Sequence, residues 1–259
     1  VLVKTNSLGL RDDEIVEDGR KKVLILGDSF TFGYGVENNE TYAEVLEKKL
    51  NGSVDVINAG YASGYSTDTE YVYLKNHGLK LKPDVVILGF FIGNDAADIN
   101  ANEWDVDDKG EIKKVKSNTY YIDDYNRLRV SGMEKLWYYD YNVYLTQNSH
   151  AYTFFKNRIK HIKESFETAD NTIYINEYDE NMSISINKTK ELIIKMHNIT
   201  NENNASFLVL FIPSKEQVYG AKIYDKKHNL LDIERINIEF LDFFAKNNIK
   251  VLYLLPYMR

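Results

Sequence analysis

Five short apolar segments, separated by stretches with helical periodicity, limit the folds that this chain can adopt. We expect strands at residues 22–27, 54–60, 84–91, 206–212 and 250–256, and amphipathic helices at residues 41–50, 67–81 and 229–248. Most of the predicted strands are apolar on both sides, which is typical of parallel strands covered by helices on both faces. The pattern therefore predicts a three-layer α/β/α sandwich around a central, parallel five-stranded sheet.

Composition narrows the possible functions. The chain has 259 residues and no cysteine, so we expect a single domain, residues 1–259, without disulfides, thiolate metal sites or a cysteine nucleophile. The formal net charge of −7 argues against nucleic acid or an anionic membrane surface as a partner, and it suits a neutral or cationic substrate. The longest apolar run, residues 85–93, is about half of the ~18 residues that a membrane-spanning helix needs.

A long insertion, residues 96–182, separates the third and fourth predicted strands by more than one crossover helix requires. Its polar first part contains Lys109 and Gly110 in sequence and predicts a β-hairpin. Its second part is helical in pattern and rich in tyrosine. The aromatic side chains fit two interpretations: a small core of their own that holds the insertion on the sheet, or a lid or wall of a substrate site.

The turn after the first predicted strand, Gly27-Asp28-Ser29, is the most specialised in the sequence. In an open parallel sheet, ligands bind at the carboxyl ends of the strands, near the point where the winding reverses. A phosphate-binding loop is one interpretation, but this turn lacks the lysine of the Walker pattern, and the pattern Gly-x-Gly-x-x-Gly is also missing. The glycines that follow, Gly33 and Gly35, are expected to let the chain bend after a short helical turn.

A serine nucleophile explains the residues at the predicted strand ends better than a phosphate-binding loop does. Ester cleavage by serine needs an exposed hydroxyl, a base, and hydrogen-bond donors aimed at the oxyanion. We expect Ser29 to lie at a helix N-terminus at the edge of the sheet, Gly60 to bring its backbone N–H to the same point, and Asn94 to supply a side-chain amide. The N–H groups of Ser29 and Gly60 and the amide of Asn94 would together form an oxyanion hole.

These segments resemble the sequence blocks of the SGNH hydrolases, also called the GDSL esterase/lipase family. GDS at 27–29 is similar to the first block, NAGYASG with Gly60 to the second, and GND at 93–95 to the third, which the family usually writes Gly-x-Asn-Asp. The resemblance implies a flavodoxin-like α/β/α fold in which Ser29, Gly60 and Asn94 are catalytic residues.

The catalytic base is harder to assign. The histidine of the family belongs to an Asp-x-x-His motif after the last strand, whereas this sequence ends at Arg259 on the last predicted strand. Asp225 and His228 have the required spacing, but they precede that strand. We expect the base to lie beyond Arg259 and keep Asp225 and His228 as the alternative. The remaining histidines lie in helical patterns and are expected to be surface or packing residues: His77, His150, His161 and His197.

The resemblance implies a serine esterase that acts through an acyl-enzyme on a small acyl ester. Segments 5–14 and 212–220 resemble a subgroup of bacterial-type envelope proteins that act on or near acylated carbohydrates, so we expect an O-acetylated carbohydrate ester and an extracytoplasmic location. The alternatives are an O-acyltransferase, a catalytically silent glycan-binding module and, more distantly, a nucleotide binder. No cofactor or metal is expected, and the sequence pattern leaves the oligomeric state open.

Overall fold

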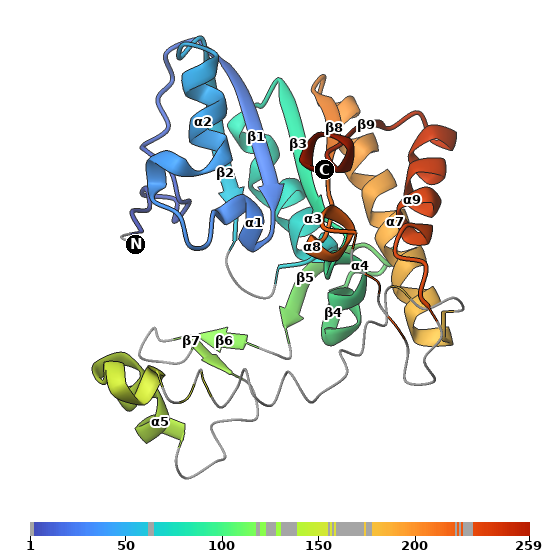
Figure 1. Cartoon of the computed structure of the whole chain (residues 1–259). Helices are drawn as coiled ribbons and strands as arrows, with labels where there is room; N and C mark the ends of the chain where they lie inside the picture. Colours follow the sequence, from blue (N-terminus) through green and yellow to red (C-terminus); the bar gives the residue numbers. More distant parts are fainter. Residues whose placement is uncertain are drawn as a thin grey trace.

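The computed structural model describes residues 3–61, 65–117, 120–122, 128–130, 139–154, 156, 158, 174, 178–220, 222, 224 and 230–259. Its centre is a five-stranded sheet in the order β2-β1-β3-β8-β9. Every neighbouring pair in this sheet is parallel, which confirms the predicted sheet (Figure 1). The strands are β1 (Lys21–Gly27), β2 (Val54–Gly60), β3 (Val85–Phe91), β8 (Ser206–Ile212) and β9 (Lys250–Tyr253).

Helices cover both faces of the sheet and make the expected three layers. The larger core lies on one face, where α3 (Thr67–Asn76), α7 (Glu180–Glu202) and α9 (Arg235–Lys246) pack on side chains such as Leu24 and Leu88. On the other face, α2 (Tyr42–Lys49) packs its Ala43 on Ile25 and Val56. Leu24 and Ile25 therefore point to opposite faces, as successive residues of a strand must.

Short elements connect these layers. The α-helical ones are α1 (Ser29–Phe32), α4 (Asp95–Asp98), α8 (Lys215–Val218) and α10 (Leu255–Met258), and the 3₁₀ turns are η1 (Asn38–Glu40), η2 (Gly78–Leu81) and η3 (Ile99–Ala101). In the described part of the chain, no helix combines the length and the apolar character that crossing a bilayer requires.

Three predicted boundaries need correction. The fifth strand ends at Tyr253 and not at residue 256, because Pro256 lies in the first turn of α10 and carries no N–H for a sheet. The helix predicted for residues 67–81 ends at Asn76 and continues as the separate turn η2. The helix predicted for residues 229–248 is α9, which begins only at Arg235.

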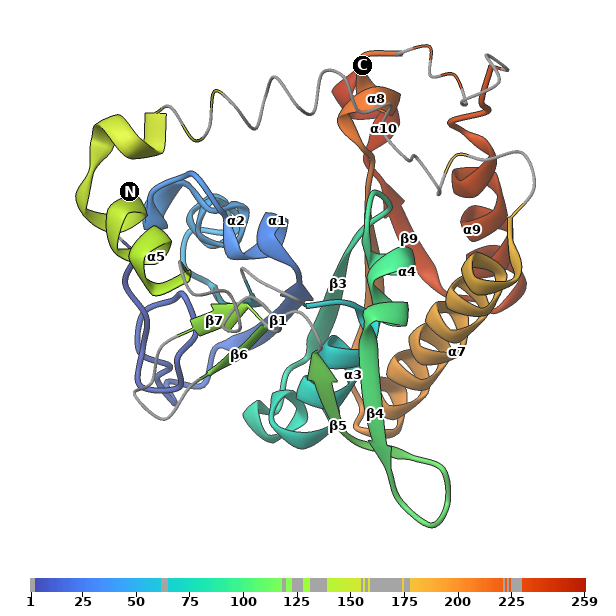
Figure 2. The same ribbon diagram turned by 90° about the horizontal axis from the view of Figure 1, so that it is seen from below.

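The first part of the insertion forms the predicted hairpin, with β4 (Asn102–Val106) antiparallel to β5 (Ile112–Ser117) and Gly110 at a positive φ in the turn. This hairpin lies beside α3 (Figure 2). Further along are β6 (Tyr120–Ile122), its antiparallel partner β7 (Leu128–Val130), and α5 (Tyr139–Asn148). The described aromatic side chains Tyr141, Tyr144 and Phe154 are exposed, and the rest of the tyrosine-rich segment lies mostly outside the described residues.

Candidate active site

The winding of the sheet reverses between β1 and β3, because the chain adds β2 on one side of β1 and then places β3 on the other. Such a switch point is where open α/β sheets bind ligands, in the crevice beyond the carboxyl ends of the strands. Ser29 follows β1 and Asn94 follows β3. The fold therefore brings these two predicted site residues to adjoining strand ends.

Ser29 is the first residue of α1, at the helix N-terminus expected from the sequence. The carboxylate of Asp28 caps the helix by accepting a hydrogen bond from the Phe30 N–H at 2.9 Å. The Ser29 side chain is half-buried, and its backbone N–H donates to none of the described residues. An unpaired N–H at a helix N-terminus is suited to stabilising negative charge that develops beside it.

Three glycines in one row across the sheet bring α1 close to it. Gly27 lies opposite Gly60 of β2 and Gly89 of β3 in the strand register. Thr31 of α1 is fully buried above this row, and a Cβ at any of the three glycines would lie within 2.6 Å of a Thr31 side-chain atom. How closely α1 approaches the sheet, and with it the position of Ser29, therefore depends on these three positions being glycines without a Cβ.

Gly60 has a packing role that explains its presence without catalysis. A Cβ there would lie 2.3 Å from the Phe32 nitrogen. Its backbone N–H donates to Oδ1 of the buried Asn58 at 3.0 Å, so in this arrangement the predicted oxyanion donor is already engaged. The role of Gly60 as a donor stays a prediction, and Gly64 of the same segment lies outside the described residues.

Asn94 is the N-cap of α4, and its side chain lies between two carboxyl groups. Nδ2 donates to Oδ2 of Asp98 at 2.9 Å, while Oδ1 is buried with no partner among the described residues. Burial raises the pKa of Asp28, and the hydrogen bond from the Phe30 N–H and the nearby Asn94 amide partly offset this increase. The amide of Asn94 therefore lies close to the carboxylate that caps the helix of Ser29.

Arg11 anchors the loop that follows α1. The side chain is only 2% exposed, and its guanidinium donates to the carbonyl oxygens of Phe32 (3.0 Å), Gly33 (2.5 Å) and Val36 (2.5 Å). Its Nε donates to Oδ1 of Asn38 at 2.8 Å. Gly33 ends α1 in the left-handed conformation, with φ of 81°, which confirms the bend expected there. Because only arginine presents several fixed donors in one plane, Arg11 can hold several carbonyl groups of this bend at once.

A cavity of about 410 Å³ opens beside Ser29. Its aromatic lining includes Phe30, which is 49% exposed and packs on the Phe91 ring, and Tyr34, which is 80% exposed. The described residues that line it are Ser29, Phe30, Gly33, Tyr34, Val36, Glu40, Thr41 and Tyr42. A cavity of this volume and predominantly apolar lining can hold a small acyl group or one sugar ring.

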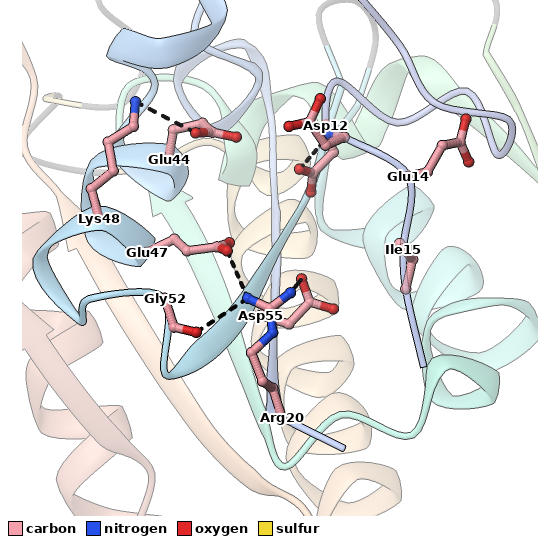
Figure 3. Close-up of a pocket in the computed structure, with 10 residues that line it drawn as sticks. Asp12, Glu14, Ile15, Arg20, Glu44, Glu47, Lys48, Gly52 and Asp55 are labelled. Carbon is pink, nitrogen blue, oxygen red and sulfur yellow. Dashed lines mark hydrogen bonds and ion pairs between the residues drawn. The ribbon is translucent and has the colours of Figure 1, made fainter. Parts of the chain in front are cut away.

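A second cavity, of about 320 Å³, lies at the outer edge of β2, between the N-terminal segment and α2 (Figure 3). Acidic side chains dominate its wall, and Arg20 pairs there with Glu47 at 2.9 Å. Asp12, at the rim, accepts a hydrogen bond from the Asn58 N–H at 2.8 Å, and burial raises its pKa to about 7. This cavity does not include Ser29 or Asn94.

The described residues supply no histidine partner for Ser29. His77 ends α3 and packs on the Tyr73 ring, and His197 of α7 bonds to Asn201. No hydrogen bond found in the described ranges joins a histidine to Ser29. Both Asp225 and His228, the alternative base pair, lie outside those ranges, as does His161.

Four residues around the site were missed by sequence reasoning: Arg11, Thr31, Asn58 and Glu70. Glu70 is fully buried in the first turn of α3, although charged residues in a helix are normally solvated. Arg11 lies in a segment noted only for its resemblance. No local pattern in the sequence distinguishes these residues, because the hydrogen bonds of Arg11, Thr31 and Asn58 and the burial of Glu70 depend on segments that are distant along the chain.

No protein-family model and no curated protein sequence matches the chain significantly. Solved structures do match it. A lipolytic protein of the G-D-S-L family from Desulfitobacterium hafniense is 16% identical, with 91% of this chain and 78% of that chain covered and a TM-score of 0.44. A lipase/acylhydrolase from Enterococcus faecalis is 14% identical, and the match covers 92% of this chain and 77% of that chain with a TM-score of 0.41. An acetyl xylan esterase is 13% identical, and the match covers 92% of this chain and 79% of that chain with a TM-score of 0.41.

The first of these structures carries one name of the family that the three sequence blocks resemble, and another match is described as an SGNH-hydrolase family esterase. A further match is described as an acylhydrolase. The low identities and TM-scores mean that the likenesses by themselves assign no activity to this chain.

Proposed function

We propose that this protein is a serine-dependent carboxylic ester hydrolase. The observation that carries the proposal is the placement of Ser29, half-buried at the N-terminus of α1 with its N–H unpaired among the described residues, beside Asn94 at the switch point of the sheet. A hydroxyl nucleophile beside donors that can stabilise an oxyanion is the basic requirement for acyl transfer from an ester.

In the proposed mechanism, the hydroxyl of Ser29 attacks the ester carbonyl and transfers its proton to a base, and the tetrahedral intermediate loses the alcohol to leave an acyl-enzyme. The N–H of Ser29 and one N–H of the Asn94 amide stabilise the oxyanion. Gly60 supplies the third donor if its N–H is released from Asn58. Water then hydrolyses the acyl-enzyme, or an alcohol takes the acyl group in the transferase variant of the proposal.

The cavity beside Ser29 supports a small, uncharged acyl ester as substrate. Phe30, Tyr34 and Val36 line it, and Glu40, the one charged side chain among the described residues of its wall, disfavours an anionic group. An acetyl ester of a carbohydrate fits these requirements, since the acyl group is small and the alcohol can extend onto the exposed Tyr34 ring.

Labelling with a fluorophosphonate tests the proposal, because the reagent phosphorylates activated serine hydroxyls. The full-length protein should be labelled at one site, which peptide mass spectrometry assigns to Ser29, and Ser29→Ala should abolish the label. Ser53→Ala is a matched control, because Ser53 is exposed at the far end of β2. A folded full-length protein that stays unlabelled contradicts the proposal.

A silent glycan-binding module remains as a second candidate function, favoured by the engaged N–H of Gly60 and by the lack of a histidine partner for Ser29 among the described residues. It predicts no labelling, together with glycan-induced thermal stabilisation that is lost in Tyr34→Ala. Labelling of Ser29 would exclude it.

A further inference from the structure

Three buried carboxyl groups from three different elements lie behind the proposed site. Asp28 is the N-cap of α1, Glu70 lies in α3 and Asp95 begins α4, and they are 3%, 0% and 0% exposed. Asp28 and Asp95 directly adjoin Ser29 and Asn94 in the sequence. The proposed mechanism uses none of the three.

Their hydrogen bonds are incomplete. Asp28 Oδ1 accepts from the Phe30 N–H at 2.9 Å, and Asp95 Oδ2 accepts from the Phe91 N–H at 2.7 Å. Four buried carboxyl oxygens have no partner among the described residues: Asp28 Oδ2, Asp95 Oδ1 and both oxygens of Glu70. Leaving four such atoms unpaired as charged acceptors is very costly in a protein interior.

Asp68, two residues before Glu70 in α3, is a buried carboxyl group whose hydrogen bonds are complete. It is also 0% exposed, but it accepts hydrogen bonds from Ser66 Oγ (2.7 Å), the Thr69 N–H (2.8 Å), Asn102 Nδ2 (3.1 Å) and Trp104 Nε1 (2.6 Å). Both oxygens of Asp68 therefore have donors, whereas neither oxygen of Glu70 has one among the described residues.

We propose that two protons, one on Asp95 Oδ1 and one on Glu70, join the three carboxyl groups into a hydrogen-bonded chain that ends at the ionised Asp28. The hydroxyl of Asp95 donates to one oxygen of Glu70, and the hydroxyl of Glu70 donates to Asp28 Oδ2. Two protons pair all four oxygens in this way, because a protonated carboxyl is both donor and acceptor. Glu70 and Asp95 are then positioning residues, and one negative charge instead of three lies behind the oxyanion.

The electrostatics agree with this order. Burial and the charges of Asp28 and Asp68 raise the pKa of Glu70 well above its usual range. Burial and the charges of Glu70 and Asp28 do the same for Asp95. Among the described residues, the other titratable groups that face these carboxyl groups are Asp98 of α4, Tyr42 of α2 and Tyr65 just before α3, and burial raises the pKa of all three. Among the described residues, no group of acidic or histidine side chains has a geometry suited to holding a metal ion instead.

The test is the pH dependence of unfolding in the full-length protein. A carboxyl group with a raised folded-state pKa stabilises the protein fully below its unfolded-state pKa, and this contribution is lost as the pH rises through the folded-state value. Glu70→Gln and Asp95→Asn replace each donor hydroxyl with an amide of the same shape. Each should remove one proton from the linkage, so the unfolding equilibrium constant of wild type relative to each variant should rise by up to about tenfold per pH unit as the pH increases above the unfolded-state pKa of about 4.

The double variant should remove two protons, whereas the exposed Glu180→Gln should follow wild type. Infrared spectra at neutral pH should show a protonated carboxyl band that Glu70→Gln weakens. Slopes equal to wild type in both single variants would overturn the proposal, as would a loss of stability on adding a chelator, which would indicate a bound cation. The inference rests on the proposed function, because it assigns the carboxyl groups to the support of an ester hydrolase site, but its test is separate. Ser29→Ala should abolish labelling and leave the proton linkage unchanged.

Discussion

The backbone N–H of Gly60 donates a hydrogen bond to Oδ1 of Asn58, at 3.0 Å, inside the protein. The same side chain donates from Nδ2 to the Thr31 carbonyl of α1, also at 3.0 Å. Asn58 therefore ties the end of β2 to the helix that carries Ser29.

Asn58→Ala should lower the free energy of unfolding by about 2 kcal/mol, because it leaves a buried N–H and a buried carbonyl unpaired. Urea denaturation measures this change. Asn39→Ala, at an exposed position in η1, is the control and should change stability by less than about 0.5 kcal/mol. Equal losses in the two variants would mean that the Asn58 bonds contribute no net stability.

Gly60→Ala should destabilise the protein by about 3 kcal/mol, because the new Cβ would lie 2.3 Å from the Phe32 nitrogen and α1 would have to move. Gly110→Ala provides the comparison. Gly110 has a positive φ of 77°, but an added methyl group would meet no atom within 4 Å, so only backbone strain of about 1 kcal/mol is expected. Chemical denaturation of both variants checks the difference, and a smaller loss for Gly60→Ala than for Gly110→Ala would contradict the close-packing explanation.

Arg11→Lys should cost about 3 kcal/mol, since a lysine cannot reproduce the donors that reach three carbonyl groups and Asn38. Arg20→Lys is the matched control. Arg20 is partly exposed and pairs with Asp18 and Glu47, so its loss should be below about 1 kcal/mol. Thermal and urea denaturation measure the stability of the two variants. Equal losses of stability would indicate a general effect of replacing arginine and would contradict the specific role of Arg11.

Asp12 should make stability depend on pH. Its pKa is raised from 3.8 to about 7, mainly by burial, so the stabilisation is fully present below about pH 4 and is lost as the pH rises to about 7. Asp12→Asn keeps an acceptor for the Asn58 N–H without the charge, and its stability relative to wild type should therefore increase over this interval. Unfolding curves at about pH 4.5 and about pH 7.5 measure the change, and a constant difference between the two proteins would contradict the assignment.

Asn94→Ala should reduce the rate of fluorophosphonate labelling about a hundredfold, the usual loss when one oxyanion donor is removed. Asn100→Ala, at an exposed position, should label like wild type. If Asn94→Ala reacts at the wild-type rate while remaining folded, then its amide is not an oxyanion donor.

The sequence was sufficient to predict the sheet, because five strands buried on both faces stand out as apolar runs between helical patterns. The strand and helix ends were less predictable. The break after Asn76 reflects Gly78, where a Cβ would lie 2.8 Å from a Leu24 side-chain atom, and that contact joins positions far apart in the chain. The longest described helix, α7, was not among the helices singled out from periodicity.

The site was predictable only in part, because some of its features also depend on contacts between positions far apart in the chain. Ser29 and Asn94 are found at adjoining strand ends, because the carboxyl ends of parallel strands share one edge. The hydrogen bond that engages the Gly60 N–H depends on the rotamer of Asn58, and the burial of Glu70 depends on how α3 packs. Neither property is encoded in a spacing, so only a three-dimensional structure reveals them.

The row of Gly27, Gly60 and Gly89 has a practical consequence for protein engineering. Because the height of α1 above the sheet is set by contact between backbones and Thr31, the walls of the cavity beside Ser29 can be redesigned independently of the nucleophile. Substitutions at Tyr34 and Val36 should alter which acyl groups are accepted while Ser29 keeps its position. The three glycines themselves are the positions that such a redesign must leave untouched.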